Sequence, residues 1–503
     1  MTERRLRRPT PASSEQCPDC PTSVRTADQK LQYAAVTPVG VTDSPPSAGV
    51  ADERSFYATR GVFEALPGRV ADGYVWPEYE RCSLDRVPGT AARALGVDLD
   101  RSLPTETVPD GDYQNVVVLL IDGYGWDRFR AGERPALLDR LAAAGETTPI
   151  TSVYPTETAA AITSLNTGRT PAEHGLLGWN LRLPSVDRTV QTLPFLTRPA
   201  DDARAAAAAD ETGSVAPTAP SLPPETASGD LVDATDGAVD GTDLFDGRSV
   251  YERLGEAGVE SHAIQPSRIV GGPYGEVATA GAQRHGVDSV AGFALSIRRQ
   301  LAAATAPTYV YAYWPNVDSA AHDAGTQSDD YAAELVAVCA AVERELDRLD
   351  DTTAAETLLL TTADHGHRQS EPSAAVDLSE IPAVWEHLAR HDDGRPVLPT
   401  GGPRNLHLHV QPGEVETMRA ALAAAPFEAR ILDGETAVDD GLFGTGPVSS
   451  KLRARVGDLV VVPESVGVWF GDEERKLEFV GQHGGQHPEE AFVPFVATPL
   501  AEW

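Results

Sequence analysis

Residues 115–121, Asn-Val-Val-Val-Leu-Leu-Ile, form an almost entirely apolar run that ends at Asp122-Gly123. A run without polar residues alternating along it is typical of a central parallel strand that is covered on both faces. Similar runs occur at 261–265, 308–314, 357–362 and 492–497. Helical patterns lie between them, at 249–258, 289–304 and 331–349. Strands that alternate with helices predict a doubly wound α/β fold with a mostly parallel sheet.

The rest of the chain divides by composition. Residues 1–52 are rich in Pro, Ser and Thr without periodicity, which predicts a disordered tail. Residues 53–109 carry short amphipathic pieces and are expected to pack on the core as an N-terminal arm. The main domain, 110–503, is expected to contain an acidic low-complexity insertion at 199–245 and a small α+β cap at 370–475.

The chain carries a formal net charge of −34. Nucleic-acid backbones and anionic membrane surfaces repel such a chain, so neither is expected as a partner. Lysine occurs only at Lys30, Lys451 and Lys476, although arginine is plentiful. Together with the acidity, this pattern indicates a halophilic organism, where high ionic strength screens the self-repulsion. A GC-rich genome would explain the shortage of lysine but not the excess of carboxylates.

Cysteine usage and hydropathy lead to an expectation about location. The 4 cysteines are too few for a disulfide scaffold in a chain of 503 residues. No apolar run approaches the ~18 residues of a membrane span. The arginine-containing start is followed by Pro, Ser and Glu rather than by the apolar segment of an export signal. A cytoplasmic protein is therefore expected, and its oligomeric state stays open.

Residues 154–168, Tyr-Pro-Thr-Glu-Thr-Ala-Ala-Ala-Ile-Thr-Ser-Leu-Asn-Thr-Gly, predict a short buried helix. Pro155 favours an extended entry, and Thr156 is expected to cap the helix. The small apolar residues that follow are unsuited to water, so the N-terminus should open into a cleft. Its free N–H groups and positive dipole end would attract an anion. Thr158, in the first turn, is the candidate nucleophile.

Asp and His residues follow several of the predicted strands. In doubly wound folds, ligands bind at the carboxyl ends of the strands. At or just after the carboxyl ends of the predicted strands lie Asp122, Asp318, His322, Asp364, His365 and His367. His483 lies in a glycine-flanked loop before the last strand. Mixed Asp and His sets suit Zn²⁺ or Mn²⁺ rather than Ca²⁺. The sequence therefore predicts a site for divalent cations.

These motifs, in this order, resemble those of the alkaline phosphatase superfamily, and most closely its type I phosphodiesterase/nucleotide pyrophosphatase branch. The resemblance covers about residues 110–500, apart from the acidic insertion. It rests on Asp122, Pro-x-x-Thr158, Thr-Pro-Ala-Glu-His-Gly175, Asp318-x-x-x-His322, Ala-Asp364-His365-Gly and Gln-His483-Gly.

The resemblance implies two divalent metal ions, with Zn²⁺ favoured and Mn²⁺ as the alternative. One ion would be held by Asp122, Thr158, Asp364 and His365. The other would be held by Asp318, His322 and His483. Two such ions clamp the attacking and leaving oxygens of an in-line displacement, and one activates the hydroxyl of Thr158.

One position departs from the pattern of the branch. Its members carry an Asn three residues after the nucleophile that binds a phosphate oxygen, whereas this chain has Ala161. Backbone N–H groups of the helix or the side chain of Asn180 are the candidate replacements. His367 is a second candidate for substrate contact, or else supports the metal ligands.

The function predicted from these residues is metal-dependent hydrolysis of a small phosphoric ester, as a phosphodiesterase or nucleotide pyrophosphatase. A phosphomonoesterase or phosphonate hydrolase on the same core is the first alternative. A binding protein of the same fold without turnover is the second. All seven proposed ligand positions are filled, which favours an enzyme.

The charge balance generates a prediction about stability. With 75 acidic and 41 basic residues, the folded chain repels itself most strongly at low ionic strength. The Tm should therefore rise steeply between dilute buffer and several molar salt in a thermal melt. A Tm that stays constant across this range would contradict the halophilic interpretation.

Overall fold

The computed structural model describes residues 69–503, apart from residues 72, 132–133, 199–240 and 393. The predicted tail, the first part of the arm and most of the acidic insertion therefore lie outside the described residues. Within these described ranges, none of the helices combines the length and apolar character needed to cross a membrane.

A seven-stranded sheet forms the centre of the molecule. Its order is β4 (Glu146–Thr151), β20 (Phe492–Pro499), β11 (Thr357–Thr362), β3 (Asn115–Ile121), β10 (Thr308–Trp314), β8 (Glu260–Pro266) and β9 (Gln283–Val287). Strands β11 to β9 in this order pair in parallel, whereas β20 is antiparallel to both of its neighbours. The predicted α/β fold with a mostly parallel sheet is confirmed, and every predicted strand run contributes to this sheet.

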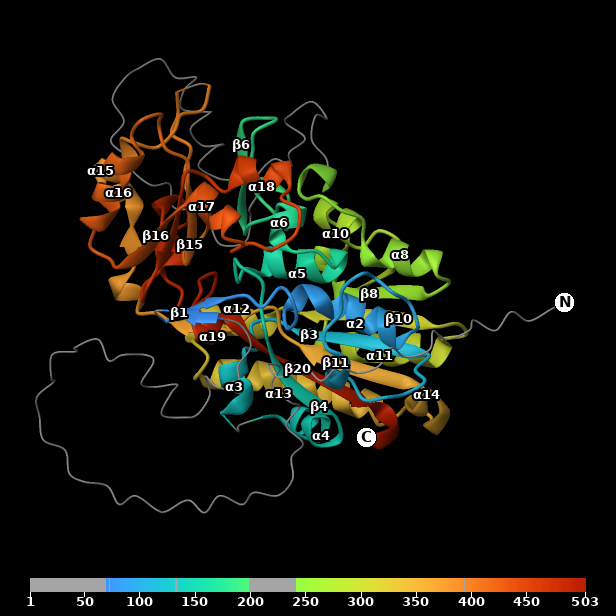
Figure 1. The fold of residues 1–503 in the computed structure, drawn as a ribbon. Helices are drawn as coiled ribbons and strands as arrows, with labels where there is room; N and C mark the ends of the chain where they lie inside the picture. Colours follow the sequence, from blue (N-terminus) through green and yellow to red (C-terminus); the bar gives the residue numbers. More distant parts are fainter. Residues whose placement is uncertain (1–68, 72, 132–133, 199–240, 393) are drawn as a thin grey trace, which may run out of the picture.

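Helices cover both faces of the central sheet (Figure 1). On one side lie α4 (Ala136–Ala144), α11 (Val290–Ala303) and α13 (Asp329–Leu346), and α13 packs against the other two. On the other side lie α2 (Val87–Ala94), α5 (Thr158–Thr167) and α8 (Val250–Glu256). Every residue of β3 is buried between these layers, which explains the continuous apolar sequence of this strand.

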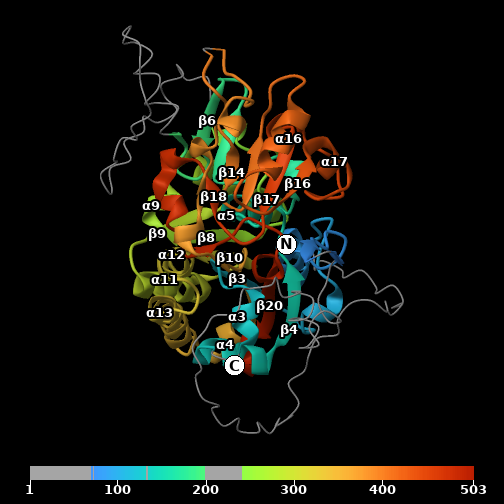
Figure 2. The same ribbon diagram turned by 90° about the vertical axis from the view of Figure 1, so that its left-hand side faces the viewer.

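A second seven-stranded sheet, here named the cap sheet, is antiparallel throughout. Its order is β16 (Ala429–Asp433), β17 (Leu459–Pro463), β15 (Asn405–Leu408), β14 (Thr400–Gly402), β5 (Asn180–Leu183), β6 (Arg188–Gln191) and β7 (Leu196–Thr197). The predicted cap supplies the first four strands, and the segment after α5 supplies the last three, joined where Gly401 pairs with Asn180. Helix α5 lies between the two sheets in both views (Figures 1 and 2).

A buried ion pair connects the cap sheet to the core. Arg404, between β14 and β15, donates from Nε to Oε1 of Glu490 at 3.1 Å and from Nη2 to Oε2 at 2.9 Å. Glu490 lies in α19 (Pro488–Ala491), and both side chains are almost fully shielded from water. The same carboxylate accepts the N–H of Gly485 at 3.0 Å. The pair therefore fixes the loop before α19 against the cap sheet.

This pair should contribute strongly to stability. Arg404→Met should cost about 3–5 kcal/mol, because it leaves the buried Glu490 carboxylate without its partner. Arg404→Met/Glu490→Met should recover much of the loss, because apolar residues of similar volume can replace a buried pair. Arg453, in an exposed pair with Glu435, is the control, and Arg453→Met should barely change the Tm. Thermal melts would contradict the account if R404M and R453M lost equal stability.

Candidate active site and metal centre

The carboxyl ends of three neighbouring strands bring the predicted site residues together. Asp122 directly follows β3, and Asp364 and His365 follow β11. Helix α12 (Asn316–Ala324) begins after β10 and carries Asp318 and His322. A spacing of four residues places these two side chains on one face of the helix. Because β11, β3 and β10 are adjacent in the sheet, all these groups meet at one edge.

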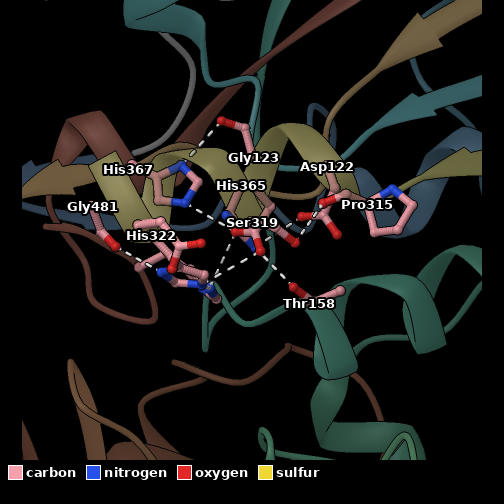
Figure 3. Close-up of polar contacts among 12 residues, drawn as sticks. Asp122, Gly123, Thr158, Pro315, Ser319, His322, His365, His367 and Gly481 are labelled. Carbon is pink, nitrogen blue, oxygen red and sulfur yellow. Dashed lines mark hydrogen bonds and ion pairs between the residues drawn. The ribbon is translucent and has the colours of Figure 1, made fainter. Parts of the chain in front are cut away.

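Four of the residues form one cluster around Nε2 of His365, here named the nucleophile-side cluster. This nitrogen lies 3.0 Å from Oγ1 of Thr158, 3.5 Å from Oδ1 of Asp122 and 3.3 Å from Oδ2 of Asp364. Figure 3 shows Thr158 pointing from the head of α5 towards His365. The structure thus places the hydroxyl of Thr158 beside an imidazole nitrogen and among buried carboxylate oxygens, all of which are possible metal ligands.

A second group, here named the histidine cluster, contains Asp318, His322, His367 and His483. Oδ2 of Asp318 lies 3.4 Å from Nε2 of His322, and Oδ1 lies 3.6 Å from Nε2 of His483. Nε2 of His367 is closest to this carboxylate, at 2.9 Å from Oδ1. His367 therefore lies against the metal-competent residues, as one of its two predicted roles requires.

The four histidines share one orientation. In each ring Nδ1 faces a backbone carbonyl, at 2.7 Å for His322 to Gly481, 3.1 Å for His365 to Gly366, 3.1 Å for His367 to Gly123 and 2.9 Å for His483 to Thr156. A carbonyl oxygen only accepts, so in His322, His365 and His483 the proton lies on Nδ1 and a neutral ring turns its Nε2 lone pair to the cluster. In His367, by contrast, Nε2 lies within hydrogen-bond distance of the Asp318 carboxylate. Burial lowers the pKa of His322 to about 4 and also lowers the pKa of His365 and His483, which favours neutral rings.

The carboxylates of the nucleophile-side cluster are each held by one oxygen only. The hydroxyl of Tyr313 donates to Oδ2 of Asp122. The N–H groups of Gly123 and His365 both donate to Oδ1 of Asp364 at 3.0 Å. The other oxygens, Oδ1 of Asp122 and Oδ2 of Asp364, are buried and accept no hydrogen bond from the described residues. Burial, followed by the charges of Asp364 and Asp318, raises the pKa of Asp122 well above its ordinary value.

The nitrogen and oxygen atoms of these residues are arranged as ligands for metal ions. Histidine nitrogens and carboxylate oxygens converge in two groups, and within each group the candidate ligand atoms lie within 4.8 Å of one another. One group is Asp122, Asp364 and His365, and the other is Asp318, His365, His367 and His483. Nitrogen and oxygen donors of this kind fit Zn²⁺ or Mn²⁺. The donor set thus fits divalent cations, which would also offset the buried negative charge.

The helix that carries Thr158 is buried as predicted, since residues 159–167 are all buried. The prediction that Thr156 caps this helix was wrong, because the N-cap position is Glu157. The hydroxyl of Thr156 instead donates to the carbonyl of Gly485 at 2.8 Å and accepts the N–H of Gly484 at 3.0 Å. Thr156 therefore ties the start of α5 to the loop that carries His483.

Asn180 lies in β5 of the cap sheet. Its side-chain amide donates to Oε2 of Glu473 at 2.7 Å. This contact ties the amide group to Glu473, in η7 (Gly471–Leu477), and gives no support to its predicted role at a phosphate. Tyr313 was not predicted as a site residue, although Tyr309, Tyr311 and Tyr313 alternate along β10 and so share one face of that strand.

Known proteins share both the sequence pattern and the fold. The family described as type I phosphodiesterase/nucleotide pyrophosphatase matches residues 116–486. No curated protein matches the chain. Murine ectonucleotide pyrophosphatase/phosphodiesterase 5 has a similar structure, with a TM-score of 0.54 at 15% identity over 76% of this chain and 87% of that chain. The human protein of this name gives 0.52 at 13% identity over 76% and 87%.

Phosphonoacetate hydrolase from Sinorhizobium meliloti is also similar, with a TM-score of 0.51 at 17% identity over 84% of this chain and 91% of that chain. At these identities the structural matches show the fold. The family match covers most of the chain, including the segments around Asp122, Thr158, Asp318, Asp364 and His483. The chain therefore belongs to the type I phosphodiesterase/nucleotide pyrophosphatase family of the alkaline phosphatase superfamily.

Proposed function

We propose that this protein hydrolyses a phosphodiester or phosphoanhydride bond in a small, nucleotide-like molecule, with Thr158 as the nucleophile. The observation that carries the proposal is the position of the Thr158 hydroxyl, 3.0 Å from Nε2 of His365 and beside the free oxygens of Asp122 and Asp364. A threonine that served only as a helix residue would not require metal-competent groups around its hydroxyl. Family membership supports hydrolysis of phosphoric esters.

Two divalent cations would be held at this site. Asp122, Thr158, Asp364 and His365 would hold one of them. Asp318, His322 and His483 would hold the other, with Zn²⁺ as the favoured ion and Mn²⁺ as the alternative. When bound, the cations supply Lewis-acid stabilisation of the attacking and leaving oxygens. His367 would support Asp318 through the contact of its Nε2 with Oδ1 of this carboxylate, at 2.9 Å.

The head of α5 supplies the nucleophile and recognises the phosphoryl group. Helix geometry leaves the first N–H groups, those of Thr158 and Ala159, without acceptors inside the helix. Together with the helix dipole they favour an anion at this end. We assign phosphate recognition to these groups, because Ala161 offers no donor and Asn180 is bonded to Glu473.

In the proposed reaction, Oγ1 of Thr158 forms a bond to phosphorus as the ester or anhydride oxygen departs. The hydroxyl proton is released, and the leaving oxygen gains a proton from solvent. Water then attacks phosphorus, breaks the bond to Oγ1 and returns a proton to Thr158. The net change is addition of one water across the substrate bond.

Two observations limit the substrate. The net charge of −34 disfavours polymeric nucleic acids, so a small molecule is proposed. An inactive threonine-to-alanine variant of murine ectonucleotide pyrophosphatase/phosphodiesterase 5 has been solved in complex with AMP. That complex supports a nucleotide-like ligand for this chain.

Replacement of Thr158 tests the proposal. Thr158→Ala should lower kcat by several orders of magnitude, about a thousandfold or more, because the attacking oxygen is lost. Thr158→Ser keeps a hydroxyl and should retain measurable turnover. Activity should be measured with bis-p-nitrophenyl phosphate, p-nitrophenyl phosphate and a dinucleotide in high salt with Zn²⁺ or Mn²⁺. The panel separates a diesterase from a monoesterase.

Thr167 provides the matched control on the same helix. It is buried, and its hydroxyl donates to the carbonyl of Thr163 at 2.7 Å, away from the cluster. Thr167→Ala should leave kcat within a few-fold of the unmodified protein. Full activity in Thr158→Ala would contradict the covalent mechanism. Absence of turnover on the whole panel with both metals would instead favour a binding protein.

A further inference from the structure

Tyr313 lies near the end of β10, beside the nucleophile-side cluster. In the parallel pairing of β10 with β3, Tyr313 is opposite Leu120 and Trp314 is opposite Ile121. The N–H of Asp122 donates to the carbonyl of Trp314 at 3.1 Å, which continues the pairing by one residue. Paired residues in a sheet point to the same face, and residues two apart in a strand do so as well. The register therefore places Tyr313 diagonally beside Asp122.

The phenol of Tyr313 is fixed in this place. Its side chain is 2% exposed, and its ring stacks on Tyr311 with centroids 6.5 Å apart and an angle of 14°. The hydroxyl donates to Oδ2 of Asp122. The second oxygen of this carboxylate, Oδ1, is left free and faces Nε2 of His365 at 3.5 Å.

The two carboxylates of this cluster are supported by different means. Asp364 is held by the backbone N–H groups of Gly123 and His365, which are fixed by the fold itself. Asp122 is held by a side-chain hydroxyl. A carboxylate can rotate about its terminal bond, so this hydrogen bond decides which oxygen is presented to the cluster. The orientation of Asp122 consequently depends on one replaceable group.

We infer that Tyr313 is a positioning residue for the cation of the nucleophile-side cluster. Its hydroxyl holds Oδ2 of Asp122 and thereby directs Oδ1 of the same carboxylate to the ion. Loss of a group that is hydrogen-bonded to a metal ligand typically lowers metal affinity about 10–100-fold. The inference rests on the proposed function, because it requires that Asp122 binds a cation.

The chain offers a matched control in Tyr311. It lies on the same face of the same strand, it is buried, and its hydroxyl has no hydrogen-bond partner among the described residues. Tyr313→Phe and Tyr311→Phe therefore remove the same atom from neighbouring positions. Metal-depleted forms of both variants and of the unmodified protein would be titrated with Zn²⁺ against a chromophoric chelator.

The unmodified protein and Tyr311→Phe should each bind two equivalents of Zn²⁺, and the affinity for each equivalent should be the same in the two proteins. In Tyr313→Phe, one equivalent should bind about 10–100-fold more weakly and the other should be unchanged. The metal-free forms of the two variants should have the same Tm. A lower Tm of Tyr313→Phe would show a loss of overall stability and not a specific effect on the metal site. Unchanged affinities in Tyr313→Phe, or equal weakening of both equivalents, would overturn the inference.

Two further outcomes are decisive. If the unmodified protein binds no Zn²⁺ or Mn²⁺, the proposed function fails, and this inference fails with it. If Tyr313→Phe does not fold, a crystal structure of the zinc-loaded unmodified protein gives the answer. The hydroxyl of Tyr313 must then lie within hydrogen-bond distance of the Asp122 oxygen that does not contact the ion, and a longer separation overturns the inference.

Discussion

Asp122 and Asp364 lie side by side, almost fully buried, and their mutual repulsion is the constraint around which the site is built. Two charged carboxylates cannot stay together in such a place unless positive charge or hydrogen-bond donors compensate them. The fold provides donors for one oxygen of each and leaves the others free. Gly123 makes this possible, because its φ of +72° turns its N–H to Asp364, and a Cβ there would lie 2.4 Å from Cε1 of His367.

The second requirement is that helix α5 and the loop that carries His483 keep their positions relative to this pair. Thr156 joins them, since its hydroxyl bonds to Gly484 and Gly485 and its carbonyl accepts Nδ1–H of His483. The ion pair of Arg404 and Glu490 then anchors the same loop to the cap sheet. In this arrangement the cap sheet supports the groups around Thr158, although it supplies none of the proposed metal ligands.

The sequence predicted the central sheet well because runs such as 115–121 and 357–362 are buried on both faces and so lack alternation. Because these apolar runs end just before Asp122 and Asp364, the sequence also predicted that both residues lie at strand ends. The pairing of Gly401 with Asn180 could not be predicted, because it joins short strands far apart in the chain. The contact of Tyr313 with Asp122 depends on the register between β10 and β3, and the role of Thr156 depends on a loop more than three hundred residues away.

The proposed chemistry depends on two cations that buried carboxylates and histidines would hold around Thr158. Anomalous diffraction from crystals grown with Zn²⁺ in high salt tests it most directly. We expect two anomalous peaks, one contacted by Asp122, Thr158, Asp364 and His365, and the other by Asp318, His322 and His483. Absence of both peaks in fully zinc-loaded crystals, or a zinc ion bound only away from Thr158, would contradict it.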